Sequence, residues 1–183
     1  MKTLVIVSHA YPEQSTAIKA LQKVAGSLDK VQVRNLESLY GHDTGAIDVA
    51  TEQAAAEAAD RLVFLFPIHW FNVTPMLKAY LNQVWSHGWA FGPGGTALQG
   101  KEMQVVVTAG ASALNYTQQG HIRSSMAEIL SPMRASAHYV GMLYNPPLAF
   151  YDAMDMAAET LANWTAQLQE CLEAPLGSHL QLG

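Results

Sequence analysis

Three short segments of the chain carry side chains that could hold a ligand. In the first, residues 8 to 16, His9 lies shortly before the adjacent hydroxyls of Ser15 and Thr16, where a helix is expected to begin. The free N–H groups and the positive dipole end of a helix favour a phosphate at that point. The same residues fit a simpler alternative, in which Ser15 only caps the helix and His9 is a hydrogen-bonded structural residue.

The second segment, residues 67 to 74, places Trp70 and Phe71 directly after an apolar run. Turns favour glycine, asparagine, aspartate and serine, so two aromatic residues at this point are unusual. They indicate either a wall for a flat, conjugated ligand or a cover for a sheet edge or an interface.

The third segment, residues 108 to 121, combines small residues from Thr108 to Ser112 with Tyr116 and His121. Small residues let a ligand approach the backbone closely. A tyrosine or a histidine beside that ligand can donate a proton or stabilise an oxyanion. The alternative is an ordinary tight turn followed by a structural tyrosine and histidine.

Apolar runs and helical periodicities alternate along the chain and would position these segments. The predicted strands are residues 4–7, 31–34, 62–66, 103–107 and 137–142, and the predicted helices are residues 17–28, 52–59, 75–85, 123–134 and 161–172. This order predicts one α/β domain over residues 1–183, with a parallel sheet covered by helices on both faces. Ligands bind such a sheet at the carboxyl ends of its strands, where the three segments lie.

The composition excludes several classes of protein. Of 183 residues, 50% are hydrophobic and 14% are charged, whereas a disordered chain has few apolar residues and many charges. The net charge is -5, and no run of lysine and arginine could form the basic face of a nucleic-acid binder. No apolar stretch approaches the roughly 20 residues of a membrane span, and the N-terminal apolar run is too short for a signal peptide. We expect a cytoplasmic protein.

The reactive residue types point away from thiol and metal chemistry. Cys171 is the one cysteine, which excludes an intramolecular disulfide and a cysteine-based zinc site. The seven histidines are dispersed and lack the paired spacing of a zinc site, so no metal is expected. No serine-centred nucleophile elbow is visible either.

The segment from Trp85 to Gly95 is aromatic and rich in glycine, and it lies outside any expected helix or strand. Its backbone would go unpaired inside a sheet core. In water it would expose a large apolar patch, which monomers rarely tolerate. A twofold homodimer would bury the patch on both subunits at once, so we expect Trp89 and its aromatic neighbours at a dimer interface.

Together these motifs resemble those of the flavodoxin-like NAD(P)H:quinone oxidoreductases, and most closely the ancillary flavoproteins of bacterial glutathione-regulated potassium-efflux systems. The motifs, which cover residues 4 to about 145, are His9-x-Tyr11-Pro12-x-x-Ser15, Pro67-Ile68-His69-Trp70-Phe71 with Pro75-x-Leu77-Lys78, Ser86 to Gly92 with Gly94 to Lys101, and Thr108-x-Gly110. The resemblance implies a flavodoxin-like three-layer sandwich with a five-stranded parallel sheet of order 2-1-3-4-5.

The resemblance also implies a flavin, and it distributes the binding residues over the three segments. The first would hold the phosphate and ribityl end, the second would line the isoalloxazine ring, and the third would supply main-chain donors to the ring. Tyr116 and His121 would lie beside the reacting quinone and protonate it. The implied cofactor-binding residues are His9, Ser15, Thr16, Ala17, Ile18, Pro67, Ile68, His69, Trp70, Phe71, Thr108, Ala109, Gly110, Ala111 and Tyr116.

The activity implied is two-electron transfer by a ping-pong mechanism, from NAD(P)H through the flavin to a quinone. The chain is short, which favours FMN over FAD, although some small relatives hold FAD. A second hypothesis is a regulatory subunit of a potassium-efflux transporter, placed at the inner face of the membrane. A third is a one-electron carrier, which the segment from Trp85 to Gly95 disfavours because a carrier leaves its flavin edge open.

Overall fold

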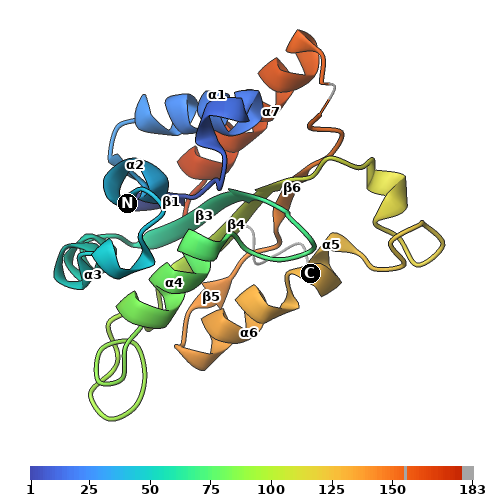
Figure 1. The fold of residues 1–183 in the computed structure, drawn as a ribbon. Helices are drawn as coiled ribbons and strands as arrows, with labels where there is room; N and C mark the ends of the chain where they lie inside the picture. Colours follow the sequence, from blue (N-terminus) through green and yellow to red (C-terminus); the bar gives the residue numbers. More distant parts are fainter. Residues whose placement is uncertain (155, 179–183) are drawn as a thin grey trace.

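Six parallel strands form one sheet in the order β2-β1-β3-β4-β5, and β6 pairs with β4 beside β5 (Figure 1). The computed structural model describes residues 1–154 and 156–178. The flavodoxin-like order predicted from the sequence is confirmed, with one strand more than expected. The strands are β1 (Thr3–Val7), β2 (Val31–Asn35), β3 (Arg61–Pro67), β4 (Glu102–Thr108), β5 (Leu143–Tyr144) and β6 (Leu148–Phe150).

Helices cover both faces of this sheet, so the molecule has three layers (Figure 1). One face is covered by α1 and α7, which pack against each other, and the other by α3, α4 and α6. The helices are α1 (Thr16–Gly26), α2 (Leu36–Tyr40), α3 (Val49–Glu57), α4 (Pro75–Val84), α5 (Met126–Ile129), α6 (Ser131–Tyr139) and α7 (Ala158–Glu173). Short 3-10 turns occur at Pro12–Gln14, Thr44–Ala46 and Ala113–Asn115.

Alternate residues of the central strands build two separate cores. In β1, Val5 and Val7 face α1 and α7, whereas Leu4 and Ile6 belong to the core on the opposite face. Because side chains alternate along a strand and both faces are covered, such a strand is apolar throughout. This is why β1 and β3 were predictable as continuous apolar runs, and β4 as an apolar run interrupted by Gln104. Within the described residues, no helix is long and apolar enough to cross a bilayer.

The fifth strand predicted at residues 137–142 is wrong, because this stretch is the end of a helix. Ala137 lies on the buried side of α6, and its carbonyl accepts a hydrogen bond from the Met142 amide at 2.9 Å. Gly141 has a φ of 75°, and its amide donates to the His138 carbonyl. These two bonds form a Schellman motif, in which a glycine in the left-handed conformation ends the helix.

The edge of the sheet is instead occupied by two short strands in sequence. β5 pairs with the first residues of β4, and β6 pairs with Val106 to Thr108. Between them lie Pro146 and Pro147, which have no N–H to donate to a ladder. The Gln104 Nε2 donates to the Pro146 carbonyl at 2.9 Å, which connects β4 to the segment between the two short strands.

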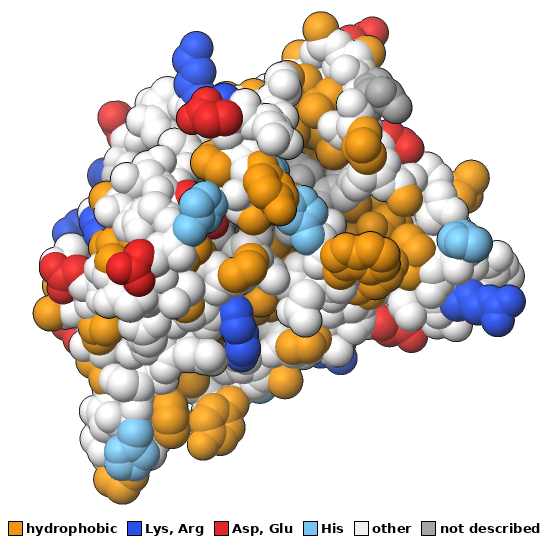
Figure 2. Space-filling view, viewed as in Figure 1, with side chains coloured by type: hydrophobic (Ala, Val, Ile, Leu, Met, Phe, Trp, Pro, Cys, Tyr) orange, Lys and Arg blue, Asp and Glu red, His pale blue; other side chains and the backbone are white. Residues whose placement is uncertain are grey.

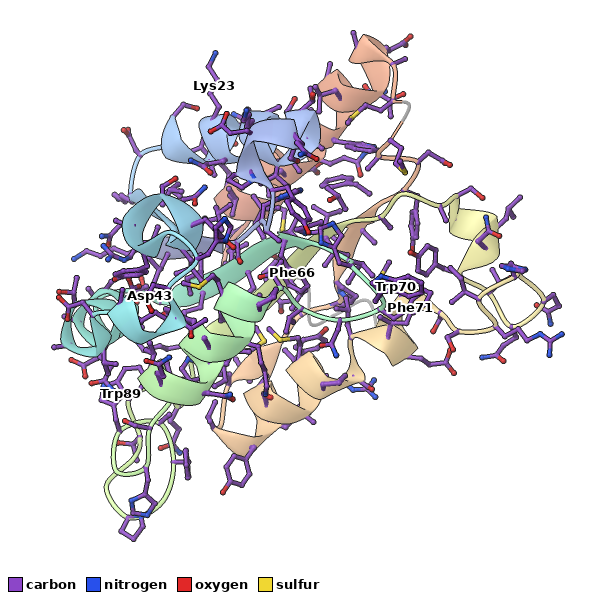
Figure 3. The ribbon with its side chains drawn as sticks, viewed as in Figure 1. Lys23, Asp43, Phe66, Trp70, Phe71 and Trp89 are labelled. Carbon is purple, nitrogen blue, oxygen red and sulfur yellow. The ribbon has the colours of Figure 1, made fainter. Side chains whose placement is uncertain are left out.

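In the segment from Trp85 to Gly95, the three aromatic residues are buried or half-buried, whereas His87, Gly88 and residues 92–94 are exposed on a loop that projects beyond the end of α4 (Figure 1). Trp85 is buried against Phe64, and Trp89 is half-buried with its Nε1 donating to Glu57 of α3 at 2.5 Å (Figure 3). The loop satisfies much of its backbone internally, for example through the Gly88 amide and the Phe91 carbonyl. The aromatic rings of this segment are thus less exposed than expected, and the homodimer stays a prediction.

Candidate functional site

A cavity of about 530 Å³ lies at the carboxyl ends of β1, β3 and β4, where the three segments meet. Figure 2 shows apolar and histidine side chains gathered on this face of the molecule. The cavity is lined by His9, Gln14, Ser15, Thr16, Ala17, Pro67, Ile68, His69, Thr108, Ala109, Gly110, Ala153, Met154 and Met156. Ten of these residues are among the cofactor-binding residues that the resemblance implied, and the ends of adjacent parallel strands bring them together.

The N-terminus of α1 opens into this cavity. Ser15 is the N-cap, and its Oγ accepts from the Ile18 amide at 3.1 Å. The amides of Thr16 and Ala17 are in the first turn, where an α-helix offers no internal acceptor. The Ser15 hydroxyl hydrogen is also free, because the capping bond uses only an oxygen lone pair. The cap and the anion site are therefore compatible roles of one side chain.

His9 adds a further donor to this end of the cavity. Its Nδ1 accepts from the Tyr11 amide at 2.9 Å, so the neutral ring carries its proton on Nε2. Burial lowers the pKa of His9, and the neighbouring His69, whose ring centroid is 5.6 Å away, lowers it further. A neutral imidazole can donate a hydrogen bond to an anion held at the helix N-terminus, but it adds no positive charge to the site.

Ser15→Ala should lower both the stability of the unliganded protein and its affinity for a phosphorylated ligand. Loss of the cap costs about 1 kcal/mol, and the lost donor should weaken binding about tenfold. Ser125→Ala is the matched control, because Ser125 caps α5 and does not line the cavity. Urea unfolding measures the loss of stability, and FMN titration measures the loss of affinity. If Ser15→Ala and Ser125→Ala bind FMN equally tightly, Ser15 does not contact the phosphate.

The second segment presents its aromatic residues on a strained turn beyond β3. Trp70 and Phe71 have φ angles of 49° and 60°, a left-handed conformation that bulky residues rarely adopt. Trp70 is 93% exposed and Phe71 46% exposed, and both lie at the tip of the loop (Figure 3). Because a strained backbone is usually retained at functional sites, the exposed rings of Trp70 and Phe71 indicate a surface that binds a ligand or a second chain.

Some main-chain amides near the cavity are hydrogen-bonded within the protein, and others are available to a ligand. The Ile68 amide donates to Thr108 at 2.8 Å, and the Ala109 amide donates to Phe150 at 2.8 Å, so neither is free for a ligand. The amides of Gly110 and Ala111 have no partner among the described residues. The free donors of the third segment are therefore fewer than the resemblance implied.

Tyr116 and His121 do not line the cavity. Tyr116 is buried with its ring centroid 5.3 Å from that of Tyr151, and His121 is exposed. Burial raises the pKa of Tyr116, and Tyr151 raises it further, so its phenol stays protonated at neutral pH. Ile18 and Ala111 are also outside the cavity lining, and Trp70 lines a neighbouring hollow of about 570 Å³ beside Tyr11.

The sequence missed one wall of the cavity, which the segment after β6 supplies. Ala153, Met154 and Met156 lie there because the Ala153 amide donates to the Ala109 carbonyl at 3.0 Å. A Cβ added to Gly110 would lie 3.2 Å from the Met154 side chain, which would have to shift by a few tenths of an ångström to admit it. Among the described residues, no group of three or more histidine, cysteine or acidic side chains could hold a metal.

Comparison with known proteins agrees with this architecture. Residues 1–172 match the Flavodoxin_2 family, described as flavodoxin-like fold. General stress protein 14 of Bacillus subtilis (strain 168) is 38% identical over 175 residues, which cover 96% of this chain and 99% of that protein. The glutathione-regulated potassium-efflux system ancillary protein KefF of Salmonella typhi is 36% identical over 171 residues, covering 93% of this chain and 95% of KefF.

Solved structures extend the likeness to three dimensions. General stress protein 14 of Treponema denticola, in complex with FMN, is 35% identical with a TM-score of 0.82, over 92% of this chain and 98% of that one. An NADPH-quinone reductase from P. pentosaceus shares the fold at 24% identity with a TM-score of 0.85, over 93% and 97%. The resemblance drawn from the motifs is confirmed: the chain belongs to the Flavodoxin_2 family of flavodoxin-like proteins.

Proposed function

We propose that the chain is an FMN-dependent oxidoreductase that reduces quinones with NAD(P)H. The observation that carries the proposal is one cavity that joins a helix N-terminus to a slot with apolar walls and free amides. The FMN held by the related protein of Treponema denticola supports this choice of cofactor. FAD is the less favoured flavin, because the chain has no evident insertion to hold an adenosine.

The residues present fit the chemistry of FMN from end to end. The phosphate would lie at α1, with the hydroxyls of Ser15 and Thr16 and the Nε2–H of His9 as donors. The ring would lie between the second and third segments, where Gly110 lines the cavity and the free amides of Gly110 and the adjacent Ala111 would donate to its polar edge. Those amides would stabilise negative charge on the ring, as the donors of an oxyanion hole do.

When bound, the flavin would supply hydride transfer from NAD(P)H to a quinone, and this chain would supply position and electrostatics. The two substrates would occupy the same slot in turn, which gives ping-pong kinetics. The proton to the quinone oxygen would come from Tyr116, which stays a neutral phenol, or from the exposed His121. Because neither residue lines the cavity, this role requires that the bound quinone extend beyond the cavity to one of them.

Trp70→Ala should weaken FMN binding or substrate turnover about fivefold, because a stacking contact of this kind is worth about 1 kcal/mol. The change should cost little stability, since the side chain is 93% exposed. Tyr139→Ala, which removes another exposed aromatic residue outside both the cavity lining and its rim, is the matched control. If Trp70→Ala leaves both the FMN affinity and the menadione kinetics unchanged, Trp70 does not contact the flavin ring.

A homodimer remains a proposal, and its expected interface moves to the rim of the cavity. Exposed large apolar side chains gather on the loops around it, at Trp70, Phe71, Leu114 and Met154. A twofold contact through this rim would complete the slot from the partner chain. Light scattering at micromolar concentration tests the dimer, and a fully active monomer would contradict it.

The likeness to KefF favours a second candidate function, an ancillary subunit of a potassium-efflux transporter at the inner face of the membrane. The two functions can coexist, and separate experiments distinguish them. The decisive test of the enzyme is the absorption spectrum of the purified protein, identification of the released flavin, and turnover of menadione with NADH and NADPH. A colourless protein that cannot be reconstituted with FMN would defeat the enzyme proposal, whereas co-purification with a transporter would support the subunit.

A further inference from the structure

Three buried side chains form a hydrogen-bonded chain that adjoins the cavity at His9 without lining it. Glu37 of α2 is 7% exposed, and Ser8 and Thr74 are fully buried. The Ser8 hydroxyl donates to Glu37 Oε1 at 2.7 Å and is in hydrogen-bond contact with the Thr74 hydroxyl. Glu37 Oε2 is buried and has no partner among the described residues.

The direction of these hydrogen bonds follows from the donors available. Thr74 Oγ1 accepts from the Leu77 amide at 3.3 Å as the N-cap of α4, so its hydroxyl hydrogen is free to reach Ser8. The Ser8 hydrogen is committed to Glu37, and a carboxyl oxygen at that point completes the chain as its final acceptor. Without this acceptor, the two buried hydroxyls could not both be satisfied as donors.

The hydrogen bonds between Thr74, Ser8 and Glu37 join the elements that carry opposite sides of the site. Ser8 immediately precedes His9, and Thr74 ends the segment that begins at Ile68. The helix that holds Glu37 is itself tied to α1, because Asn35 Nδ2 donates to Gln22 Oε1 at 2.6 Å. Glu37 therefore connects the phosphate end of the cavity with the aromatic turn.

Glu37 accepts the last hydrogen bond of these buried hydroxyls, but its own Oε2 is buried without a partner among the described residues, which costs about 1–3 kcal/mol. An apolar residue would remove that cost and would leave the Ser8 hydroxyl without an acceptor. We propose that Glu37 is a positioning residue that, through Ser8 and Thr74, sets the separation of the two sides of the cavity and so its affinity for flavin. It does this without touching the ligand, and the flavin part of the claim rests on the proposed function.

Two measurements test this role, one of them independent of any ligand. The first is amide hydrogen exchange at residues 68–74 in the flavin-free protein, where the amides of Ile68, Asn72 and Val73 are hydrogen-bonded. The second is the dissociation constant of FMN. Glu37→Leu should speed exchange at this segment and weaken FMN binding, each about tenfold. Glu37→Gln should stay within about twofold, because its amide oxygen still accepts from Ser8.

A double-mutant cycle separates positioning from general destabilisation. Ser8→Ala should reproduce the effects of Glu37→Leu, and the double variant should be no worse than the worse single variant, because both break one chain. If Glu37→Leu does not fold, Ser8→Ala together with Glu37→Gln carries the test. Asp48→Ala, which removes the N-cap of α3 away from the cavity, is the control for a simple loss of stability.

The outcomes are distinct. Faster exchange confined to residues 68–74 in Glu37→Leu or Ser8→Ala, with Asp48→Ala unchanged there, would support the positioning role. Unchanged exchange at that segment, additive effects, or an increase spread evenly over the protein as in Asp48→Ala would overturn it. If the unmodified protein bound no FMN, the proposed function would fail, and the exchange data would still decide the role of Glu37.

Discussion

Replacing Thr16 with glutamate is expected to weaken FMN binding about a hundredfold while leaving the unliganded protein as stable as before. Thr16 is the first residue of α1, is exposed and lines the cavity. A phosphate carries a charge of about -1.5 to -2 at neutral pH. A carboxylate about 5 Å from it costs roughly 3 kcal/mol for each unit of phosphate charge at the effective dielectric of a protein surface, and salt screening lowers the total. Among the described residues that line the cavity, there is no lysine or arginine that could offset the repulsion.

In the unliganded protein the same glutamate should be neutral or slightly stabilising, because a negative charge in the first turn complements the helix dipole. Thr16→Gln is the control for size, and it should bind FMN within a few-fold of the unmodified protein. Riboflavin, which lacks the phosphate, should bind Thr16→Glu and Thr16→Gln equally. High salt should narrow the difference for FMN. If Thr16→Glu binds FMN as tightly as Thr16→Gln, the phosphate does not lie at α1.

Replacing Arg61 with methionine should destabilise the protein by about 3–5 kcal/mol, because it breaks a buried ion pair. The Arg61 side chain is fully buried, and its Nε donates to Glu102 Oε2 at 2.8 Å. Its guanidinium also bonds the carbonyls of Cys171 and Ala174 at 3.0 and 2.9 Å, at the end of α7. Removing Arg61 would leave Glu102 as an unpaired buried charge and free these carbonyls at once.

Thermal unfolding should register the loss of Arg61 as a fall of about 10 °C in the midpoint. Arg61→Met/Glu102→Leu should recover much of the loss, since an apolar pair leaves no buried charge. Arg61 is the first residue of β3 and the cavity lies at the other end of that strand, so FMN affinity at low temperature should not change. A midpoint within 2 °C of the unmodified protein, or a loss of FMN affinity in the folded variant, would contradict this assignment.

Much of the fold could be read from local patterns. The runs that became β1, β3 and β4 are apolar because both faces of each strand are buried, a condition that leaves a continuous signal in the sequence. The start of α1 near Ser15 followed from its capping residue, and the start of α4 from Pro75. Because adjacent parallel strands end at one edge, most of the cavity lining followed from where those strands stop.

The remainder depends on contacts between residues far apart in the chain, which periodicity does not record. The apolar residues from Ala137 to Met142 resemble a strand, and only the packing of α6 and the turn at Gly141 make them a helix end. Pairing of β6 with β4 brings Met154 to the cavity and uses the Ala109 amide. Likewise, Glu37 reaches Ser8 only because β1 and β2 are neighbours. Residue types and their order decide which segments can form a site, and tertiary pairing decides which of their donors remain free to serve it.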